Sequence, residues 1–555
     1  MLHLKAFFGK IWVGKWLPYI LYVLSLAAVL PYAFCYVNNP DAYQYISIAR
    51  KIAEGHFSLS INGYWSPLIS WLMSVPIFFG IGSIAAFKLV QVLIGFFTIK
   101  AWLRLLEFFG FENWNRKILG LVIIPFVLNY SILNPTADLL FLTLLLFVLN
   151  VFLQNEWMNS RRASVKLGLL GACLYFAKAF GFPLFIALLL LTIIFSFFEK
   201  DKRGTIKKML PVFVVFISMS SLWILHISIK YHGFTISKAA QFNLSREVAP
   251  LPGQIMQLPV LSGSLLHPPD PYAISAWESP GDPVGLTPIS PLSSKTDSEY
   301  HRLIITRNLA SIWYNDFRSQ IGFIFSFMLF GFVVFRNRKT VKLNRPVLFL
   351  FFTLVLIYLG YALILVHPRY IWICSWILML LSVWMWEKLS IDKPWTNDLK
   401  RFVVILILLL AVKRPVKEIL FTEDSDMPLL WIGKGITHPF ETMSITYRPE
   451  KFLQKAVDDL KKLPDFKGSF ASLNSANGER HAYSSSLFIA NEFGEQYFGP
   501  LNEKLSLDEM KQQLEAFNIS IFLVWNHDEW PGAEDPSFKK LLFDPNLGLS
   551  VYGLF

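Results

Sequence analysis

Four charged side chains stand beside apolar segments, where a group in water can meet a group carried by a lipid. They are Asp41 in NNPDAYQYISIARKIAEGHFSLSINGYWSPL, Asp138 in NPTAD, Lys178 in AKAFGFP and Arg369 in HPRY. Transfer of a sugar from a lipid phosphate needs one carboxylate, because the phosphate leaves as an anion and only the acceptor hydroxyl loses a proton. Glycoside hydrolysis would need a second carboxyl group to protonate the leaving oxygen.

Each carboxylate also has a structural interpretation. Asp41 precedes AYQYISIARKIAEG, in which the apolar residues recur at helical spacing, so Asp41 is the cap of this helix, a catalytic group or both. The helix carries Arg50 and Lys51 away from its apolar stripe, which predicts that it lies in the membrane interface. Asp138 begins the very apolar LLFLTLLLFVL and either caps that helix or binds phosphate or a metal ion.

The cations have two interpretations as well. Lys178 lies between two apolar segments, so its amine either reaches the membrane surface, pairs with an anion or binds a lipid phosphate. Lys88, near the end of another apolar segment, has the same alternatives. Arg369 lies between two apolar segments and either clamps a phosphate with two donors or contacts lipid headgroups.

Aromatic residues accompany these charges. Tyr64 and Trp65 precede a proline and either stack on a sugar or anchor the chain at headgroup depth. A long loop rich in glycine and proline at 230–317 offers Tyr272, Trp277 and Glu278, and a loop of this kind can close over a substrate. Its PLPGQ, HPPDP and ESPGDP motifs predict turns rather than a packed core.

The composition is that of an integral membrane protein. Of the 555 residues, 54% are hydrophobic and 16% are charged, whereas soluble domains have about 25% charged residues. The net charge of +12 comes from short basic clusters between apolar segments, which is typical of cytoplasmic loops and argues against nucleic acid as a partner. Cys35, Cys173 and Cys374 lie in or beside apolar segments, so neither a disulfide framework nor a zinc site is expected.

The chain is long enough for about eleven membrane spans, given roughly 17 to 25 residues for each. The segment 67–80 is too short and is predicted not to cross. This assignment puts the basic clusters on the cytoplasmic side, with the N-terminus inside and the C-terminus outside. The predicted spans are 11–36, 83–103, 118–134, 137–154, 166–180, 181–199, 209–229, 318–335, 345–366, 369–387 and 400–413.

The hydropathy pattern divides the chain into two parts. Residues 1–413 are predicted to form a transmembrane core with extracytoplasmic loops at 37–82 and 230–317, and residues 414–555 a soluble extracytoplasmic α/β domain. In the second part we expect helices at 449–463 and 506–517, the latter opened by a Ser506/Glu509 capping box. Strands are expected at 468–474, 520–526 and 549–555.

With these motifs, the sequence resembles the GT-C superfamily of integral-membrane glycosyltransferases, in particular its bacterial branch related to protein O-mannosyltransferases and the lipid A aminoarabinose transferase. The stretch PDAYQYISIARKIAEGHFSLSINGYWSPL resembles the first extracytoplasmic loop of this family, NPTADLLFLTLLL the second, and HPRYIWICSWILML its Arg-Tyr motif. The resemblance implies a polytopic helical fold in the plasma membrane. It also implies inverting transfer of a hexose or pentose from a polyprenyl-phosphate donor to a lipid, glycan or protein acceptor.

The resemblance assigns roles to individual residues. Asp41 matches the catalytic acid, Asp138 a second loop acid, and Arg369 with Tyr370 the motif at the donor phosphate. Relatives often have paired acids where this chain has Pro40 and Asp41, which leaves a divalent metal ion at Asp41 and Asp138 uncertain. Some relatives have a lysine where this chain has Tyr64, Trp65 and Ser66, and this difference directs phosphate binding to Lys88 or Lys178. His367 stands at a position where relatives frequently have an acid.

Two other classes of function remain as alternatives. A transporter or flippase of lipid-linked saccharides would have charges near the middle of its spans and two pseudo-symmetric halves, whereas these charges cluster at span ends. A membrane-anchored binding protein would act through its C-terminal domain.

Overall fold

The computed structural model describes most of the chain. The described residues are 16–33, 37, 39–154, 156–158, 160–196, 202–248, 265–281, 294–313, 328, 345–388, 395–420, 450–463, 466–474, 479–525, 530 and 532–554.

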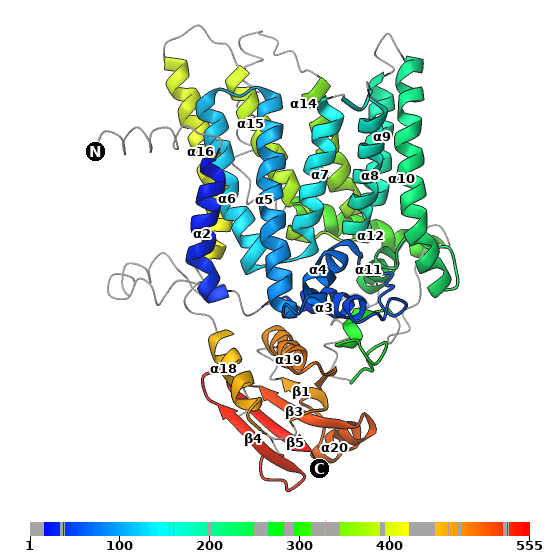
Figure 1. Ribbon diagram of the computed structural model, residues 1–555, viewed down its shortest axis with the longest axis vertical. Helices are drawn as coiled ribbons and strands as arrows, with labels where there is room; N and C mark the ends of the chain where they lie inside the picture. Colours follow the sequence, from blue (N-terminus) through cyan, green and yellow to red (C-terminus); the bar gives the residue numbers. More distant parts are fainter. Residues whose placement is uncertain are drawn as a thin grey trace, which may run out of the picture.

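A bundle of long apolar helices forms the upper part of the molecule (Figure 1). Short corners such as Asn134–Thr136 and Lys178–Phe180 join neighbouring helices, which therefore run in opposite directions. The bundle consists of α2 (Leu17–Ala33), α5 (Ser83–Phe109), α6 (Asn113–Leu128) with the π-helix η1 (Asn129–Leu133), α7 (Ala137–Gln154), α8 (Arg161–Ala177), α9 (Gly181–Ser196), α10 (Lys202–Lys230), α14 (Arg345–Ala362), α15 (Trp372–Lys388) and α16 (Trp395–Leu420).

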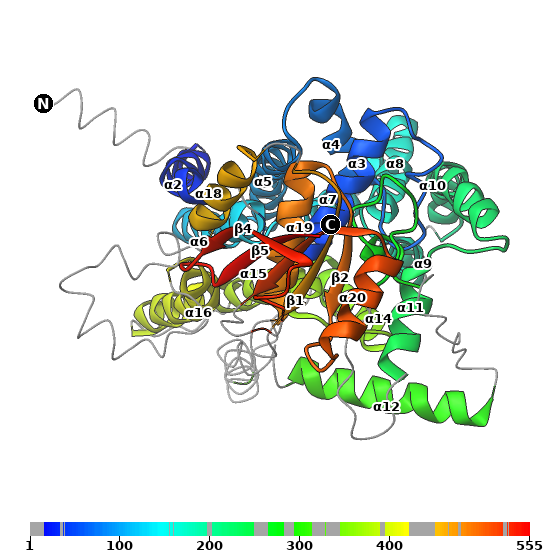
Figure 2. The ribbon, with the colours of Figure 1, turned by 90° about the horizontal axis from the view of Figure 1, so that it is seen from below.

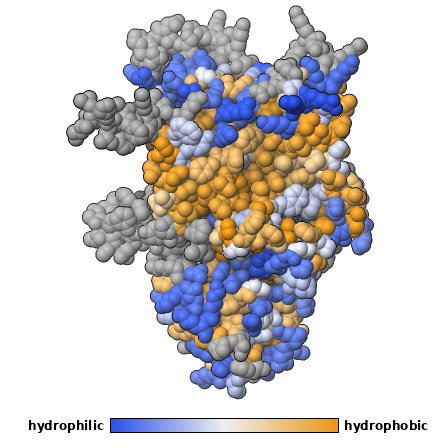
Figure 3. All heavy atoms as spheres, viewed as in Figure 1, coloured by the Kyte–Doolittle hydropathy of each residue, from blue (hydrophilic) through white to orange (hydrophobic). Residues whose placement is uncertain are grey.

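Within the described residues, five helices are long and apolar enough to cross a membrane, and they lie at Ser83–Phe109, Asn113–Leu133, Ala137–Gln154, Ile206–Lys230 and Arg345–Ala362. On the face seen in Figure 3, an apolar band crosses the bundle between two more polar ends. On α10, Leu210, Phe213 and Leu222 are exposed, which suits a surface in contact with lipid rather than water. The predicted span at 318–335 lies, except for Met328, outside the described residues.

Two shorter helices lie at one end of the bundle. α3 (Pro40–Ala53) and α4 (Leu68–Phe78) lie next to each other at the end that faces the C-terminal domain (Figure 1). The 11 residues of α4 extend over about 16 Å at 1.5 Å per residue, about half of the hydrocarbon thickness. α4 is therefore too short to cross, as predicted for the segment 67–80.

Lys51 lies off the apolar stripe of α3 but not on an open polar surface. Its side chain is fully buried and forms ion pairs with Asp270 and Glu278 of the long loop. The helical pattern placed Lys51 off the apolar stripe. It did not reveal that this side of α3 is covered by a loop more than 200 residues further along the sequence.

Within the described residues, the C-terminal domain consists of a five-stranded sheet and three helices. The strand order is β2-β1-β3-β5-β4; β1 pairs with β2 and β3 in parallel, and β5 pairs with β3 and β4 antiparallel. The strands are β1 (Ser469–Asn474), β2 (Tyr497–Leu501), β3 (Ile519–Trp525), β4 (Phe538–Asp544) and β5 (Leu549–Leu554), and the helices are α18 (Glu450–Leu460), α19 (Glu479–Phe493) and α20 (Leu507–Ala516).

This domain confirms the predicted elements and adds three. Both expected helices and all three expected strands are present, and the capping box of Ser506 and Glu509 is complete. α19, β2 and β4 were not predicted. The predicted boundary at residue 414 falls inside α16, which continues to Leu420.

The long loop contains more structure than its turns suggested. α11 (Ala239–Val248) and α12 (Lys295–Ser311) flank the segment 265–281, and α12 lies along the periphery when the molecule is viewed from the sheet (Figure 2). Within 265–281, the side chains of Ala273, Ile274 and Trp277 are buried. This segment is packed between α3 and the C-terminal domain, so the expectation of turns without a packed core is wrong for it.

Candidate active site

Asp41 lies in the first turn of α3 and accepts hydrogen bonds on both carboxylate oxygens. Arg369 Nη2 donates to Oδ2, and the indole Nε1 of Trp277 donates to Oδ1 at 3.0 Å. The capping interpretation of Asp41 is wrong, because the N-cap is Asn39, whose side chain accepts from the backbone N–H of Asp41. Each carboxylate oxygen has two lone pairs, so Asp41 retains capacity to accept from a further donor.

A second carboxylate joins the same group. Asp138 Oδ1 accepts from Lys178 Nζ, Asp138 Oδ2 accepts from Thr136 Oγ1 at 2.9 Å, and Arg369 Nε lies 3.6 Å from Oδ2. Charges thus alternate along the series Asp41, Arg369, Asp138, Lys178. The side chains are 15%, 20%, 10% and 21% exposed in that order, so each is largely buried but still reachable from outside.

Aromatic rings border the two cations. Lys178 Nζ lies 3.4 Å from the ring centroid of Tyr370 and 5.6 Å from that of Tyr361. The guanidinium carbon of Arg369 lies 5.4 Å from the Tyr370 centroid. The face of the Tyr370 ring attracts the cationic side chain of Lys178. Tyr361, which the sequence analysis did not single out, belongs to this group.

Three corners of the bundle bring these residues together. Arg369 lies in the short 3-10 helix η6 (Pro368–Tyr370) between α14 and α15, Asp138 in the first turn of α7, and Lys178 at the C-cap of α8. The corner after Lys178 is tight, because a Cβ built on Gly181 would lie 2.3 Å from the carbonyl oxygen of Leu174. Glycine is therefore required there to keep Lys178 in place.

Other residues singled out in the sequence support the site or lie beside it. Lys88 is fully buried and donates to the backbone carbonyl of Ile132, next to the corner that presents Asp138. Tyr64 and Trp65 pack edge-to-face with each other, with ring centroids 4.7 Å apart, and Trp65 Nε1 donates to the carbonyl of Trp277 at 3.2 Å.

His367 and Glu278 do not join the alternating charges. His367 lies beside Tyr370. Partial desolvation of the ring, followed by the charge of Arg369, lowers the pKa of its imidazole to about 4, so the ring is neutral at pH 7. Glu278 is buried and accepts from Lys51 Nζ at 2.5 Å and from Ser47 Oγ at 2.6 Å. Burial raises the pKa of Glu278 above its ordinary value.

The two acids that were considered for a metal ion do not fit one. Asp41 is neutralised by Arg369, and Asp138 by Lys178 and Arg369, so a divalent cation would be repelled by two positive side chains at this position. Within the described part of the chain, no three His, Cys, Asp or Glu side chains are grouped so that they could hold a metal ion.

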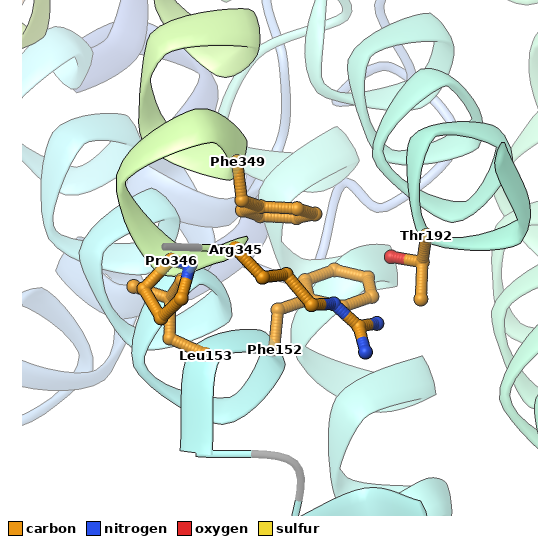
Figure 4. A pocket seen from close by; sticks show the side chains of 6 residues that line it. All are labelled: Phe152, Leu153, Thr192, Arg345, Pro346 and Phe349. Carbon is orange, nitrogen blue, oxygen red and sulfur yellow. The ribbon is translucent and has the colours of Figure 1, made fainter. Parts of the chain in front are cut away.

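A small cavity of about 40 Å³ lies near the other end of the bundle (Figure 4). Phe152, Thr192, Arg345 and Phe349 contribute to its lining. Ligand sites typically have volumes of about 300 to 1,000 Å³, so this cavity is too small for a sugar.

Comparisons with known proteins agree with the fold. Neither a protein-family model nor a curated protein sequence matches this chain. Two solved structures of similar fold are ArnT from Cupriavidus metallidurans in the apo state and the same protein bound to undecaprenyl phosphate. Both are 12% identical with a TM-score of 0.52, and the matches cover 96% and 97% of this chain and 97% and 98% of ArnT.

The chain therefore shares its overall fold with ArnT over nearly its whole length. ArnT is the lipid A aminoarabinose transferase, so the resemblance inferred from the loop motifs is confirmed for the fold. At 12% identity, this likeness concerns the fold alone.

Proposed function

We propose that this protein transfers a sugar from a polyprenyl-phosphate donor to an acceptor hydroxyl at the outer face of the membrane. The observation that carries the proposal is the contact between Asp41 and Arg369, which lie 328 residues apart in the sequence. A carboxylate able to accept a proton thus lies beside a cation able to bind phosphate, at one end of an apolar bundle.

In the proposed reaction, the acceptor oxygen attacks the anomeric carbon of the donor. The acceptor oxygen supplies the electron pair of the new glycosidic bond, and Asp41 takes its proton. The bond from the anomeric carbon to the phosphate oxygen breaks, and its electron pair leaves with the polyprenyl phosphate. Attack opposite to the leaving group inverts the configuration at this carbon.

Arg369 and Lys178 are the proposed ligands of the donor phosphate. Arg369 uses Nη2 for Asp41 and directs Nε towards Asp138, which leaves its Nη1 donors for a phosphate oxygen. Lys178 has one acceptor, Asp138, and lies against Tyr370. The undecaprenyl phosphate bound to ArnT, which has a similar fold, supports a polyprenyl phosphate as the lipid. Lys88 acts on this site indirectly, by supporting the corner at Ile132.

We infer that the site faces the outside, with the N-terminus in the cytoplasm and the C-terminal domain outside. This orientation follows the positive-inside rule. The ends of α5 and α15 that carry Arg104 and Lys388 lie away from the C-terminal domain, and the Asp41 site lies next to it (Figure 1). The acceptor is then a lipid, glycan or protein outside the cytoplasm.

The proposal is tested with purified full-length protein and a panel of polyprenyl-phosphate sugars, by following release of polyprenyl phosphate. Wild-type protein should turn over one donor in the presence of its acceptor. Asp41→Asn keeps the shape of the side chain but removes the base, and its rate should fall by at least about 100-fold. The matched control is Asp398→Asn, since Asp398 is 86% exposed on α16 and should leave the rate unchanged.

Two results would refute the proposal. A folded Asp41→Asn protein with wild-type rate would remove Asp41 as the base. Absence of turnover with every donor would favour the binding or transport alternatives, which a flotation assay with lipid-linked saccharides in vesicles then separates.

A further inference from the structure

The segment 265–281 connects the candidate active site with the C-terminal domain. β2 is an edge strand of the sheet, and an uncovered edge strand exposes unpaired backbone groups. In this protein, Ser275 forms a parallel bridge with Tyr497 of β2, whose N–H donates to the carbonyl of Ile274 at 2.7 Å. The segment therefore continues the sheet beyond its edge strand.

Side chains strengthen this connection. Gln496 Nε2, one residue before β2, donates to the carbonyls of Asp270 at 2.9 Å and Ala273 at 3.0 Å. Near the start of the segment, the N–H of Leu266 donates to the carbonyl of Phe498, the second residue of β2, at 2.8 Å. The C-terminal domain thus holds the segment at several points along its length.

The opposite side of the segment is fixed to α3. Lys51 Nζ contacts Glu278 and Asp270, each at 2.5 Å, and Ser47 Oγ donates to Glu278 at 2.6 Å. Asn62 Nδ2 donates to the carbonyl of Glu278 at 2.7 Å. These contacts surround Trp277, which lies immediately before Glu278 and is 5% exposed.

We propose that Trp277 is a positioning residue that orients the carboxylate of Asp41, and that the C-terminal domain holds Trp277 in place through the segment 265–281. The inference rests on the proposed function of Asp41 as a base. Arg369 binds one carboxylate oxygen and Trp277 the other, so together they fix the plane of the carboxylate. Without Trp277 Nε1, the carboxylate is free to rotate about its bond to Cβ.

The first variant is Trp277→Phe, which keeps a large ring but removes the indole N–H. Loss of a hydrogen bond to a charged group corresponds to a fall in kcat/KM of about 10- to 100-fold. The matched control is Trp530→Phe in the C-terminal domain, because Trp530 is 3% exposed and its Nε1 has no hydrogen-bond partner among the described residues. The control should keep wild-type activity.

The pH profile separates positioning from a general loss of structure. A hydrogen bond to the ionised carboxylate favours the form that accepts the proton, so Trp277→Phe should move the acidic limb of kcat/KM to higher pH. Other groups near Asp41 remain unchanged in this variant. Those that carry charge or titrate are Arg369, Asp138, Lys178, His367, Tyr45 and Tyr483.

The second variant tests the role of the C-terminal domain. Gln496→Ala removes two hydrogen bonds to the segment without touching the site, and should lower kcat/KM by about 2- to 10-fold. Because its effect passes through Trp277, it should cause no further loss when combined with Trp277→Phe. Gln454→Ala is the control, since Gln454 bonds only to Asp458 of its own helix among the contacts of the described residues.

Hydrogen exchange gives a readout that does not depend on turnover. In full-length Gln496→Ala, amides at 270–278 should exchange faster than in wild type or Gln454→Ala. Unchanged exchange, additive effects in the double variant, or a wild-type pH profile in Trp277→Phe would each overturn the inference. If wild-type protein transfers no sugar, the proposed function fails, while the exchange experiment still decides whether the C-terminal domain holds the segment.

Discussion

Replacing Lys51 by methionine should release the segment 265–281 from α3. The Lys51 side chain is fully buried, and Glu278 and Asp270 are 2% and 11% exposed. In Lys51→Met, the buried carboxylate of Glu278 therefore retains the hydrogen bond from Ser47 but loses its cation. The nearly buried carboxylate of Asp270 loses the same cation. Removing one member of a buried ion pair costs about 3 to 5 kcal/mol.

This cost should depend on pH. Burial raises the pKa of Glu278, and Lys51 is the largest influence that lowers it, so Lys51→Met should raise the pKa of Glu278 further. A carboxyl group whose pKa is higher in the folded than in the unfolded state destabilises the fold as pH rises through the folded value. Below the unfolded value of about 4.3, both states are protonated and this penalty disappears.

The assay is hydrogen exchange of the segment 265–281 in full-length protein at several pH values. At 1.4 kcal/mol for each factor of ten, the expected acceleration at pH 7 lies between about a hundredfold and a few thousandfold, and it should shrink towards pH 5. Lys461→Met is the control, since Lys461 is 45% exposed in its pair with Glu492 and such pairs contribute little.

A double variant separates charge from packing. Lys51→Met with Glu278→Met removes both members of the buried pair and should recover part of the lost protection, because no unpaired charge remains at Glu278. If Lys51→Met changes exchange no more than Lys461→Met does, the buried pair does not fix the segment and the reasoning is refuted. If the double variant exchanges faster than Lys51→Met, lost packing rather than an unpaired carboxylate is the cause.

Three further predictions follow from the site and its corners. Lys178→Met should raise the KM for a polyprenyl-phosphate donor by about tenfold or more, because a charge-assisted contact to phosphate is lost. Lys166→Met, near the distant start of α8, should leave KM unchanged, and equal KM values in the two variants would remove Lys178 from the phosphate site. Gly181→Ala should destabilise the protein by about 1 to 3 kcal/mol, because the added Cβ meets the Leu174 carbonyl, whereas a Cβ at Gly82 has nothing within 4 Å. Thermal unfolding compares Gly181→Ala with Gly82→Ala, and equal melting temperatures would contradict the tight corner. Treatment with EDTA should leave turnover unchanged, since Arg369 and Lys178 already neutralise both acids; loss of activity restored by a divalent cation would show that a metal ion takes part.

The apolar pattern predicted most of the helices because burial and lipid contact both demand long apolar segments. It predicted α7 and α9 within a few residues and showed that α4 is too short to cross. In the C-terminal domain, the capping box of Ser506 and Glu509 marked the start of α20 because its hydrogen bonds are local. The strand β4 was missed because FKKLLFD has exposed residues at its centre and therefore lacks the alternation of a half-buried strand.

The sequence placed Asp41, Asp138, Lys178 and Arg369 on one face but did not reveal which groups would pair. Charge clusters and span lengths determine the side of the membrane on which a loop lies. The contacts between loops depend on packing across the bundle, as with Lys178 and Asp138, which are 40 residues apart. The same limit explains Lys51, which local periodicity placed away from the apolar stripe without revealing the two carboxylates that a distant loop provides.

The role of Arg369 follows from the number of its donors. If this residue served only as an ion-pair partner, a lysine would suffice for Asp41. Its guanidinium instead reaches two carboxylates from different helices through Nη2 and Nε, and a planar group with five donors can bind a phosphate at the same time. Donor binding therefore does not require Arg369 to release Asp41, and the carboxylate can keep its orientation, fixed on its other oxygen by Trp277, while the leaving phosphate gains negative charge.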